Sequence, residues 1–366
     1  MLGWAARAQL PAFPWDRLAP LAQVAREHPG GIVDLSIGTP VDPTPAVVRR
    51  ALSAAADAPG YPLTIGTPAL REAVVAWSRS RLGAEVTAAN VLPSIGSKEL
   101  VALLAQLLGL GGSRVLLPRL AYPTYDAGAR LAGCVPVPTA DPTAEDPAGV
   151  ALVWLNSPSN PTGEVLPPER LRDTVAWARS HGILVASDEC YLELGWDAEP
   201  VSVLDPAICG GSTDGVLALH SLSKRSNLAG YRAGFAVGDA TAVGLLVEAR
   251  KHLGLLTPAP VQAAVVAALG DDTHVVEQRA RYRARRDVLQ TAVRAAGFEV
   301  QHSEAGLYLW CTRDEDCWTT AGALAEAGVL VAPGDFYGAD GARHVRLALT
   351  ATDERVAAAA ERLAAL

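Results

Sequence analysis

The stretch VALVWLNSPSNPTGEVLPPERLRDTVAWARSHGILVASDE, residues 150–189, decides the fold class. Its two ends, 150–155 and 183–187, are short runs that are apolar on both faces, which is typical of buried strands. Between them, residues 167–182 have the pattern of an amphipathic helix, with proline at its start and glycine just past its end. A strand, a helix and a second strand in this order predict a parallel βαβ unit.

The same alternation continues on both sides of this stretch. Further short apolar runs occur at 114–118, 216–220 and 233–238. We therefore predict an α/β fold with a mostly parallel sheet flanked by helices, in a large domain formed by residues 45–280. A long charged helix at 273–297 breaks the alternation, and shorter strands and a final Ala-rich helix follow it. Residues 281–366, joined by the N-terminal residues 1–44, are predicted to form a smaller α+β domain.

The composition argues against several classes of protein. The 366 residues carry a formal net charge of −8, which disfavours a basic nucleic-acid-binding face. The five cysteines form no Cys-x-x-Cys pair, so we expect neither a disulfide framework nor a zinc site, and a reducing, cytoplasmic setting. Residues 1–15 lack the apolar core of a signal peptide, and the most apolar run, 100–112, is too short to span a bilayer and predicts a buried helix.

Motifs for dinucleotides, nucleoside triphosphates and metals are missing: the chain has no Gly-x-Gly-x-x-Gly after a strand, no Walker motif and no His-Glu-x-x-His. Lysine is rare, with only Lys98, Lys224 and Lys251, so its position is informative where it occurs. Polar residues instead gather just past the ends of the apolar strands. That edge of an open α/β sheet is where ligands bind.

The first polar place is SIGSKELVALLAQ, residues 94–106, where a Gly-Ser turn opens directly into an apolar helix. Free N–H groups and the helix dipole make such a turn an anion site. Gly96 allows close approach, and the N–H groups of Ser97 and Lys98 would hold a phosphate. The alternative is a simple serine N-cap.

Two further places follow apolar strands and carry aromatic or amide side chains. In the first, Tyr122 or Tyr125 would stack on a flat ring, and the alternative is packing in the core or a loop. In the second, Asn156 and Asn160 are set among proline and glycine, which fixes an amide donor in place. The alternative there is a turn chosen only for its geometry.

The last two places carry charge. Asp188 ends a strongly apolar run, where a carboxylate is costly unless a cation compensates it; the alternative is an N-cap. Lys224 follows the strand 216–220, with Ser221 and Ser223 before it and Arg232 after it. A partly buried lysine there suits covalent capture of an aldehyde, because desolvation lowers its pKa.

Together these places describe one ligand. It carries a phosphate, a flat ring with a hydroxyl group, a ring nitrogen that a carboxylate keeps protonated, and an aldehyde. Pyridoxal phosphate has all these groups, so we predict it as the cofactor. The residues assigned to it are Gly96, Ser97, Lys98, Ser221 and Arg232 for the phosphate, Tyr122, Asn160 and Tyr191 for the ring and its hydroxyl, Asp188 for the nitrogen and Lys224 for the aldehyde.

The chain resembles the class I/II aminotransferases of the aspartate aminotransferase superfamily, which have fold type I, over nearly its whole length. The resemblance is carried by Tyr61 in YPLTIGTPALREAV, the turn at 96–98, Tyr122, Asn-Pro-Thr-Gly at 160–163, Asp188 with Tyr191, Ser-x-Ser-Lys at 221–224, Arg232, and Arg346 in HVRLAL.

This resemblance implies roles and partners. Lys224 would bind the cofactor covalently and act as a catalytic residue together with Asp188 and Tyr191. Tyr61 would reach the phosphate in the neighbouring subunit, which implies a homodimer with shared sites. Arg346 would bind the substrate α-carboxylate as a bidentate fork, with Gly38 beside that carboxylate and Asn160 also at the substrate.

Longer phrases resemble the succinyldiaminopimelate aminotransferases of actinobacteria; among them are LSIGTPVDPTP (35–45), NSPSNPTGEVL (156–166) and VLVAPGDFYG (329–338). This implies amino transfer from N-succinyl-LL-2,6-diaminopimelate to 2-oxoglutarate in lysine and diaminopimelate biosynthesis. No motif identifies the group that would bind the succinyl carboxylate. Arg225, Arg250 and Lys251 are candidates by charge alone.

Other functions stay open. The chain could be an aminotransferase for aspartate, alanine or N-acetylornithine, or a fold type I carbon–sulfur β-lyase, because these enzymes share the same cofactor shell. A cofactor-binding sensor within a transcription regulator would need a DNA-binding extension, which we do not expect in this acidic chain.

Overall fold

The computed structural model describes residues 10–365. The first nine residues, which belong to the predicted N-terminal arm and to the segment expected not to be a signal peptide, lie outside this range. None of the helices within residues 10–365 combines the length and the apolar character needed to cross a membrane.

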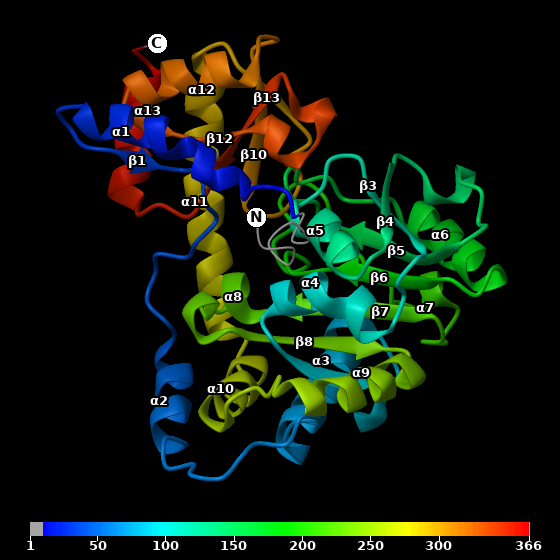
Figure 1. Cartoon of the computed structure of the whole chain (residues 1–366). Helices are drawn as coiled ribbons and strands as arrows, with labels where there is room; N and C mark the ends of the chain where they lie inside the picture. The colour runs from blue at the N-terminus through cyan, green and yellow to red at the C-terminus, as the bar shows by residue number, and fades with distance from the viewer. Residues whose placement is uncertain (1–9, 366) are drawn as a thin grey trace, which may run out of the picture.

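The centre of the described chain is a seven-stranded sheet (Figure 1). In spatial order its strands are β2 (Val91–Ile95), β8 (Ala233–Gly238), β7 (Val216–Ser221), β6 (Leu184–Asp188), β5 (Val150–Asn156), β3 (Arg114–Pro118) and β4 (Val135–Thr139). The pairings among β3, β4, β5, β6 and β7 are parallel, which confirms the prediction of a mostly parallel α/β fold. Strand β8 is antiparallel to both its neighbours, because residues 222–232 form a short connection instead of a crossover helix.

Helices cover both faces of this sheet, which explains why its strands are apolar on both sides. On β5, Val153 and Leu155 belong to one buried cluster, whereas Leu152 and Trp154 belong to another. The first face is covered by α3 (Pro68–Leu82), α6 (Pro168–Ser180) and α10 (Ala259–Leu269), and the second by α4 (Ser97–Leu107), α5 (Thr124–Leu131) and α9 (Ala240–Leu253).

A second, smaller sheet has its own buried cluster. Its antiparallel strands are β12 (Ala332–Pro333), β13 (His344–Ala348), β10 (Tyr308–Thr312) and β9 (Glu299–Gln301), and β1 (Val33–Asp34) pairs separately with β11 (Val329–Leu330). Helices α1 (Ala19–Glu27), α12 (Cys317–Glu326) and α13 (Asp353–Leu363) lie around it in Figure 1. These are segments that the sequence assigns to a smaller domain; the boundaries at 45 and 280 stay a prediction.

Helix α11 (Thr273–Ala295) connects the two regions (Figure 1). Near its start, His274 hydrogen-bonds Ser226 over 2.8 Å, just after α8 (Leu222–Arg225). Further along, Arg285 pairs with Asp42 and with Asp353 of α13, each at 2.6 Å. The remaining short helices are α2 (Ala46–Ala54), α7 (Pro206–Cys209) and the 3-10 turns η1 (Pro14–Leu18), η2 (Ala88–Asn90), η3 (Pro142–Ala144), η4 (Ala229–Tyr231), η5 (Gly334–Tyr337) and η6 (Ala339–Gly341).

Candidate active site

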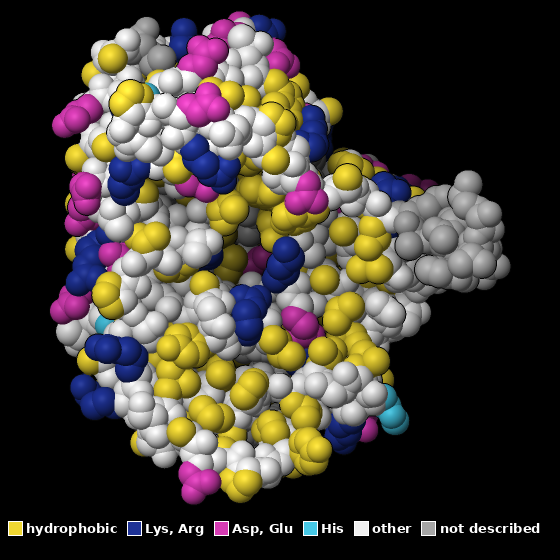
Figure 2. Space-filling model, turned by 60° about the vertical axis from the view of Figure 1, so that its left-hand side comes forward, with side chains coloured by type: hydrophobic (Ala, Val, Ile, Leu, Met, Phe, Trp, Pro, Cys, Tyr) yellow, Lys and Arg dark blue, Asp and Glu magenta, His cyan; other side chains and the backbone are white. Residues whose placement is uncertain are grey.

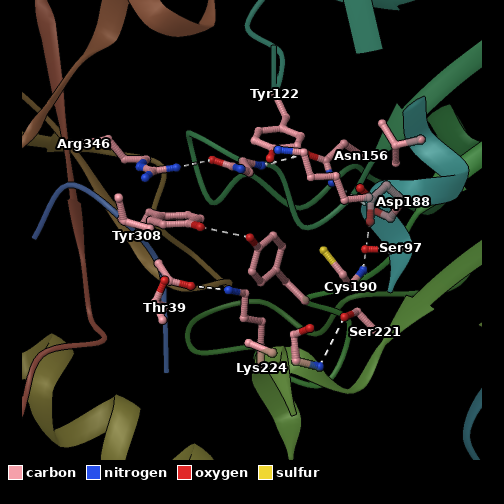
Figure 3. Close-up of a pocket in the computed structure, with 18 of the residues that line it drawn as sticks. Thr39, Ser97, Tyr122, Asn156, Asp188, Cys190, Ser221, Lys224, Tyr308 and Arg346 are labelled. Carbon is pink, nitrogen blue, oxygen red and sulfur yellow. Dashed lines mark hydrogen bonds between the residues drawn. The ribbon is translucent and has the colours of Figure 1, made fainter. Parts of the chain in front are cut away.

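A cavity of about 420 Å³ lies at the C-terminal ends of β5, β6 and β7. Figure 2 shows a hollow on this face of the molecule, with Lys and Arg side chains at its rim, and Figure 3 shows the cavity lining. The volume falls within the range of about 300–1,000 Å³ that is typical of small-molecule sites. Most of the predicted site residues line it: Gly38, Ser97, Lys98, Tyr122, Asn160, Asp188, Tyr191, Ser221, Lys224, Arg232 and Arg346.

Asp188 ends β6 with its carboxylate buried (Figure 3). The Tyr125 hydroxyl donates to Oδ2 over 3.0 Å, and the Cys190 backbone N–H donates to Oδ1 over 3.3 Å. Burial raises the pKa of the Asp188 carboxyl, and the hydrogen bonds from Cys190 and Tyr125 act in the opposite direction. No lysine or arginine of residues 10–365 is among the groups that hold this pKa down. A cationic group on a ligand would therefore be stabilised against Asp188.

Lys224 lies in α8, directly after β7, and its side chain reaches across the cavity to the backbone carbonyl of Gly38 (Figure 3). Burial lowers the pKa of the Lys224 ammonium from its usual 10.5 to about 8. The guanidinium groups of Arg346 and Arg232 act in the same direction, whereas Cys190 opposes it. An amine that is partly uncharged near neutral pH can serve as a nucleophile or a base.

One end of the cavity gathers groups suited to an anion. Gly96 has φ of +72°, and a Cβ there would lie 2.5 Å from Nη2 of Arg232, so glycine permits this close approach. Arg232 is itself left-handed at φ +56°, and its Nη1 donates to the Ala229 carbonyl over 2.9 Å. Ser97 begins α4, where backbone N–H groups have no partner within the helix, and the buried Ser221 faces the same end.

The opposite wall is built around Arg346 on β13. Its Nη1 donates to Asn160 Oδ1 over 2.8 Å, and its Nη2 donates to the Ser36 carbonyl over 2.7 Å. The guanidinium carbon lies 3.8 Å from the ring centre of Tyr308, whose hydroxyl is 3.0 Å from that of Tyr191 (Figure 3). Arg346 is only 2% exposed, and within residues 10–365 its hydrogen-bond acceptors are neutral. A buried guanidinium held in this way keeps its charge for an anionic ligand.

Lys98 places a third cation at the cavity. Its ammonium lies 5.5 Å from the ring centre of Tyr122 and 5.4 Å from that of Phe13, and the side chain is exposed. Cation–π contact with two rings holds the ammonium near the cavity without neutralising it. The sequence predicts a role for the backbone N–H of Lys98 in phosphate binding. The structure shows that the Lys98 side chain also lies at the cavity.

Four candidates lie away from this cavity. Tyr61 is 97% exposed, so its predicted role would require a second copy of the chain. Arg225 and Arg250 are buried and ion-paired, with Glu193 at 2.7 Å and with Glu99. The exposed Lys251 pairs with Glu248 at 2.6 Å. None of these three cations lines the cavity, because each is paired elsewhere.

Sequence reasoning missed the aromatic side of the cavity. Phe13 and Trp15 line it from the N-terminal segment, and the indole N–H of Trp15 donates to the Ser36 carbonyl over 3.3 Å. Tyr308 was missed as well. The available signal was the alternation of the aromatic residues Tyr308 and Trp310 along β10, the strand that pairs with β13 and therefore lies beside Arg346. Gly38 fits against Tyr308 because any Cβ at this position would overlap the Tyr308 hydroxyl.

The fold and this cavity together fit a pyridoxal-phosphate-dependent enzyme. One cavity offers donors for a phosphate, an aromatic face, a buried carboxylate without a cation and an amine of lowered pKa. The glycine at 96 leaves room at the anion end that a side chain would fill. These are the groups that this cofactor requires from a protein.

Comparison with known proteins gives the family. The model of aminotransferase class I and II matches residues 31–363. The 4-dedimethylamino-4-oxo-anhydrotetracycline transaminase OxyQ of Streptomyces rimosus is 59% identical over 356 residues, which cover 97% of this chain and 99% of that protein. The probable aminotransferase Rv1178 of Mycobacterium tuberculosis is 60% identical over 358 residues, which cover 97% of this chain and 86% of that protein.

A solved structure agrees with these relatives. The probable N-succinyldiaminopimelate aminotransferase of Thermus thermophilus matches with a TM-score of 0.86 and 30% identity, covering 96% of this chain and 99% of that one. The chain belongs to the class I and II aminotransferases. It has their fold type I architecture and depends on pyridoxal phosphate.

Proposed function

We propose that this aminotransferase moves an amino group from N-succinyl-LL-2,6-diaminopimelate to 2-oxoglutarate, with glutamate as the other product, in lysine and diaminopimelate biosynthesis. The observation that carries this proposal is the set of cations around one cavity. Arg232 lies at the anion end, Arg346 is buried in the opposite wall, and Lys98 stands at a third position. A phosphate and an α-carboxylate account for the first two. The Lys98 ammonium is then left to bind a distal carboxylate, and both the succinyl substrate and 2-oxoglutarate carry such a group.

The proposed roles of the chain's residues follow from their positions. Arg232, Ser221, Ser97, Gly96 and the backbone N–H of Lys98 hold the cofactor phosphate. Tyr122 stacks on the ring, Asn160 and Tyr191 bind its hydroxyl, and Asp188 keeps its nitrogen protonated. Arg346, with Gly38 and Asn160 beside it, binds the α-carboxylate. The partner subunit's Tyr61 completes the phosphate site, so the working form is a homodimer, located in the cytoplasm.

When bound, pyridoxal phosphate supplies an electron sink that makes the substrate Cα acidic. Lys224 Nζ would take the proton from Cα, acting as a base, and then deliver it to the C4′ carbon of the cofactor, acting as an acid. Its pKa of about 8 suits this exchange, because both protonation states are populated near neutral pH. Arg346 fixes the carboxylate, so that the Cα proton points at Lys224 and not at solvent.

A second candidate substrate is a polycyclic ketone. The similarity to the tetracycline transaminase favours it, and so does the apolar mouth of the cavity, where Phe13 is 51% exposed and Ile37 is 50% exposed. Exposed apolar side chains at a cavity mouth suit a ligand with a large apolar surface.

A substrate panel with 2-oxoglutarate tests these alternatives. N-succinyl-LL-2,6-diaminopimelate is expected to exceed aspartate, alanine and N-acetylornithine by about tenfold or more in kcat/KM. The variant Lys98→Met should raise KM for that substrate about tenfold and leave KM for alanine unchanged, because alanine has no distal carboxylate. A preference for aspartate or alanine would overturn the substrate, and faster reaction of a polycyclic ketone would establish the second candidate. Pyruvate and ammonia released from cystathionine would indicate a β-lyase activity.

A further inference from the structure

A second, much smaller cavity lies directly behind the active site. Its volume is about 10 Å³, which is room for about one water molecule. Cys190 and Ser221 line both this cavity and the large one, so the two cavities are adjacent. The other residues that bear on the argument are Trp77, Glu189, His220 and Arg225.

Polar atoms of these four residues are buried around the small cavity. Within residues 10–365, no hydrogen-bond partner is found for Glu189 Oε2, His220 Nε2, Trp77 Nε1 or Arg225 Nε. Buried polar atoms in proteins almost always have a partner, either protein or ordered water. Glu189 Oε2 and His220 Nε2 lie 3.7 Å apart, too far for a direct hydrogen bond. Their convergence on a space of this size therefore indicates a bound water.

Both side chains are fixed next to residues of the active site. Glu189 follows Asp188; its backbone N–H donates to Leu219 over 2.9 Å, and its Oε1 accepts from the Val203 N–H over 2.8 Å. His220 precedes Ser221 in β7, and its ring is enclosed by Trp77 at 4.8 Å and Phe235 at 5.3 Å between ring centres. The pair thus joins the end of β6 to the end of β7.

The charges around the pair leave Glu189 without a cation of its own. Arg225 faces the cavity but pairs with Glu193 at 2.7 Å. Cys190 lines both cavities, whereas Asp188 and Lys224 line only the large one. Burial raises the pKa of Glu189 to about 7, against the opposing effect of the Val203 N–H and of the Ser202 and Ser187 side chains, and the charge of Asp188 adds to the rise. Burial, helped by Arg225, lowers the pKa of His220 to about 3. The imidazole is therefore neutral near pH 7 and can accept a hydrogen bond.

We propose that Glu189 and His220 hold one water molecule between them and form a positioning pair that fixes the turn carrying Asp188 against the turn carrying Ser221 and Lys224. The water accepts a hydrogen bond from the protonated Glu189 or from Arg225, and donates to His220 Nε2. This inference rests on the roles proposed for Asp188 and Lys224, but it does not depend on the substrate.

A crystal structure of the holoenzyme is the direct test. We expect density for one water within hydrogen-bond distance of Glu189 Oε2 and His220 Nε2. A direct hydrogen bond between these two atoms, with no water, would overturn the proposal. This readout is independent of catalysis, so it stands even if Lys224 proved not to bind the cofactor.

Two variants test the positioning role. Glu189→Gln keeps the shape but cannot ionise, so it removes the negative charge that appears near the active site as pH rises through about 7. The visible absorption of the holoenzyme changes with pH, and the variant should lower the midpoint of that change by about half a pH unit. His220→Phe keeps the aromatic packing but removes the acceptor. It should lose the water and lower kcat about fivefold, with KM changed less than about twofold.

Thr174→Val is the matched control, because its hydroxyl is also buried without a partner in the described chain but lies in α6, away from both cavities. It should change neither the absorption midpoint nor kcat. Should His220→Phe fail to fold, His220→Asn takes its place. An unchanged kcat in the folded His220 variant, or an effect of equal size in Thr174→Val, would contradict the positioning role.

Discussion

The two walls of the active-site cavity are built by different means. On the sheet side, Asp188 is the last residue of β6 and Lys224 follows the end of the neighbouring strand β7, and the register of the two strands pairs Asp188 with Leu219. On the opposite side, Arg346 is held by Asn160 and Ser36, which are 186 and 310 positions away in the chain. One wall therefore follows from local strand order, whereas the other exists only once distant segments have met.

The walls also carry Asp188 and Arg346, two opposite charges that have no ion-pair partner among residues 10–365. Asp188 is buried against neutral donors, and Arg346 is buried against neutral acceptors. Elsewhere, buried Arg250 is paired with Glu99, as expected for a structural ion pair. Arg250 therefore belongs to the scaffold, whereas Asp188 and Arg346 are available to charged groups of a ligand in the cavity.

The largest test of the sheet wall is Lys224→Ala. Removing the Lys224 amine should lower kcat by about 10⁴-fold, because base catalysis and covalent binding are both lost. The visible absorption of the bound cofactor should change with it. Lys251→Ala, at an exposed surface ion pair, is the control and should leave both unchanged. Wild-type turnover in Lys224→Ala would remove this residue from the chemistry.

The matching test of the opposite wall is Arg346→Lys. A lysine keeps the charge but cannot form the bidentate fork or stack on Tyr308, so KM for amino acids should rise about 10–100-fold. Steady-state kinetics with several amino donors measures it. Arg343→Lys, at an exposed pair with Asp314, should behave as wild type. If KM stayed the same, the α-carboxylate would have to bind elsewhere.

The pH dependence of cofactor binding tests a property of the sheet-side wall alone, namely the lowered pKa of Lys224. Below its pKa of about 8, most Lys224 is protonated and cannot attack an aldehyde. The rate at which apoenzyme binds pyridoxal phosphate should therefore rise about tenfold per pH unit up to about 8 and then level off. Stopped-flow absorption would follow it. A midpoint near 10.5 would mean that burial does not lower this pKa.

The smallest expected effect belongs to Tyr308→Phe. It removes the hydrogen bond to Tyr191 but keeps the ring beneath Arg346, so kcat/KM should fall only a few-fold, on the order of one hydrogen bond. Tyr337→Phe is the matched control, since the Tyr337 hydroxyl has no hydrogen-bond partner among residues 10–365. Equal effects in the two variants would mean that the bond to Tyr191 contributes nothing.

Sequence reasoning went furthest where structure is local. Strands β3 and β8 begin and end at the residues expected, and the helix at 168–180 lies within the segment predicted for it. The order of polar residues along the strand ends placed Asp188, Asn160 and Lys224 at one cavity, because parallel strands end at a common edge.

It went less far where distant segments meet. Nothing in the order of residues places Trp15 next to Ser36, or Tyr308 beneath Arg346, because these contacts depend on how the small sheet packs. The antiparallel course of β8 was missed for a related reason: an apolar run does not state its direction. The choice of Tyr125 over Tyr122 as the partner of Asp188 depends on which side of a helical turn each residue occupies.

Helix α11 physically connects the two walls of the cavity. Its 23 residues form one continuous rod, about 34 Å long at about 1.5 Å per residue. Its start contacts the segment that follows Lys224, and Arg285 clamps its far half to Asp353 in the region that carries Arg346. Because a continuous helix transmits displacement along its axis, the position of the segment after Lys224 and the position of the region that carries Arg346 are coupled through α11.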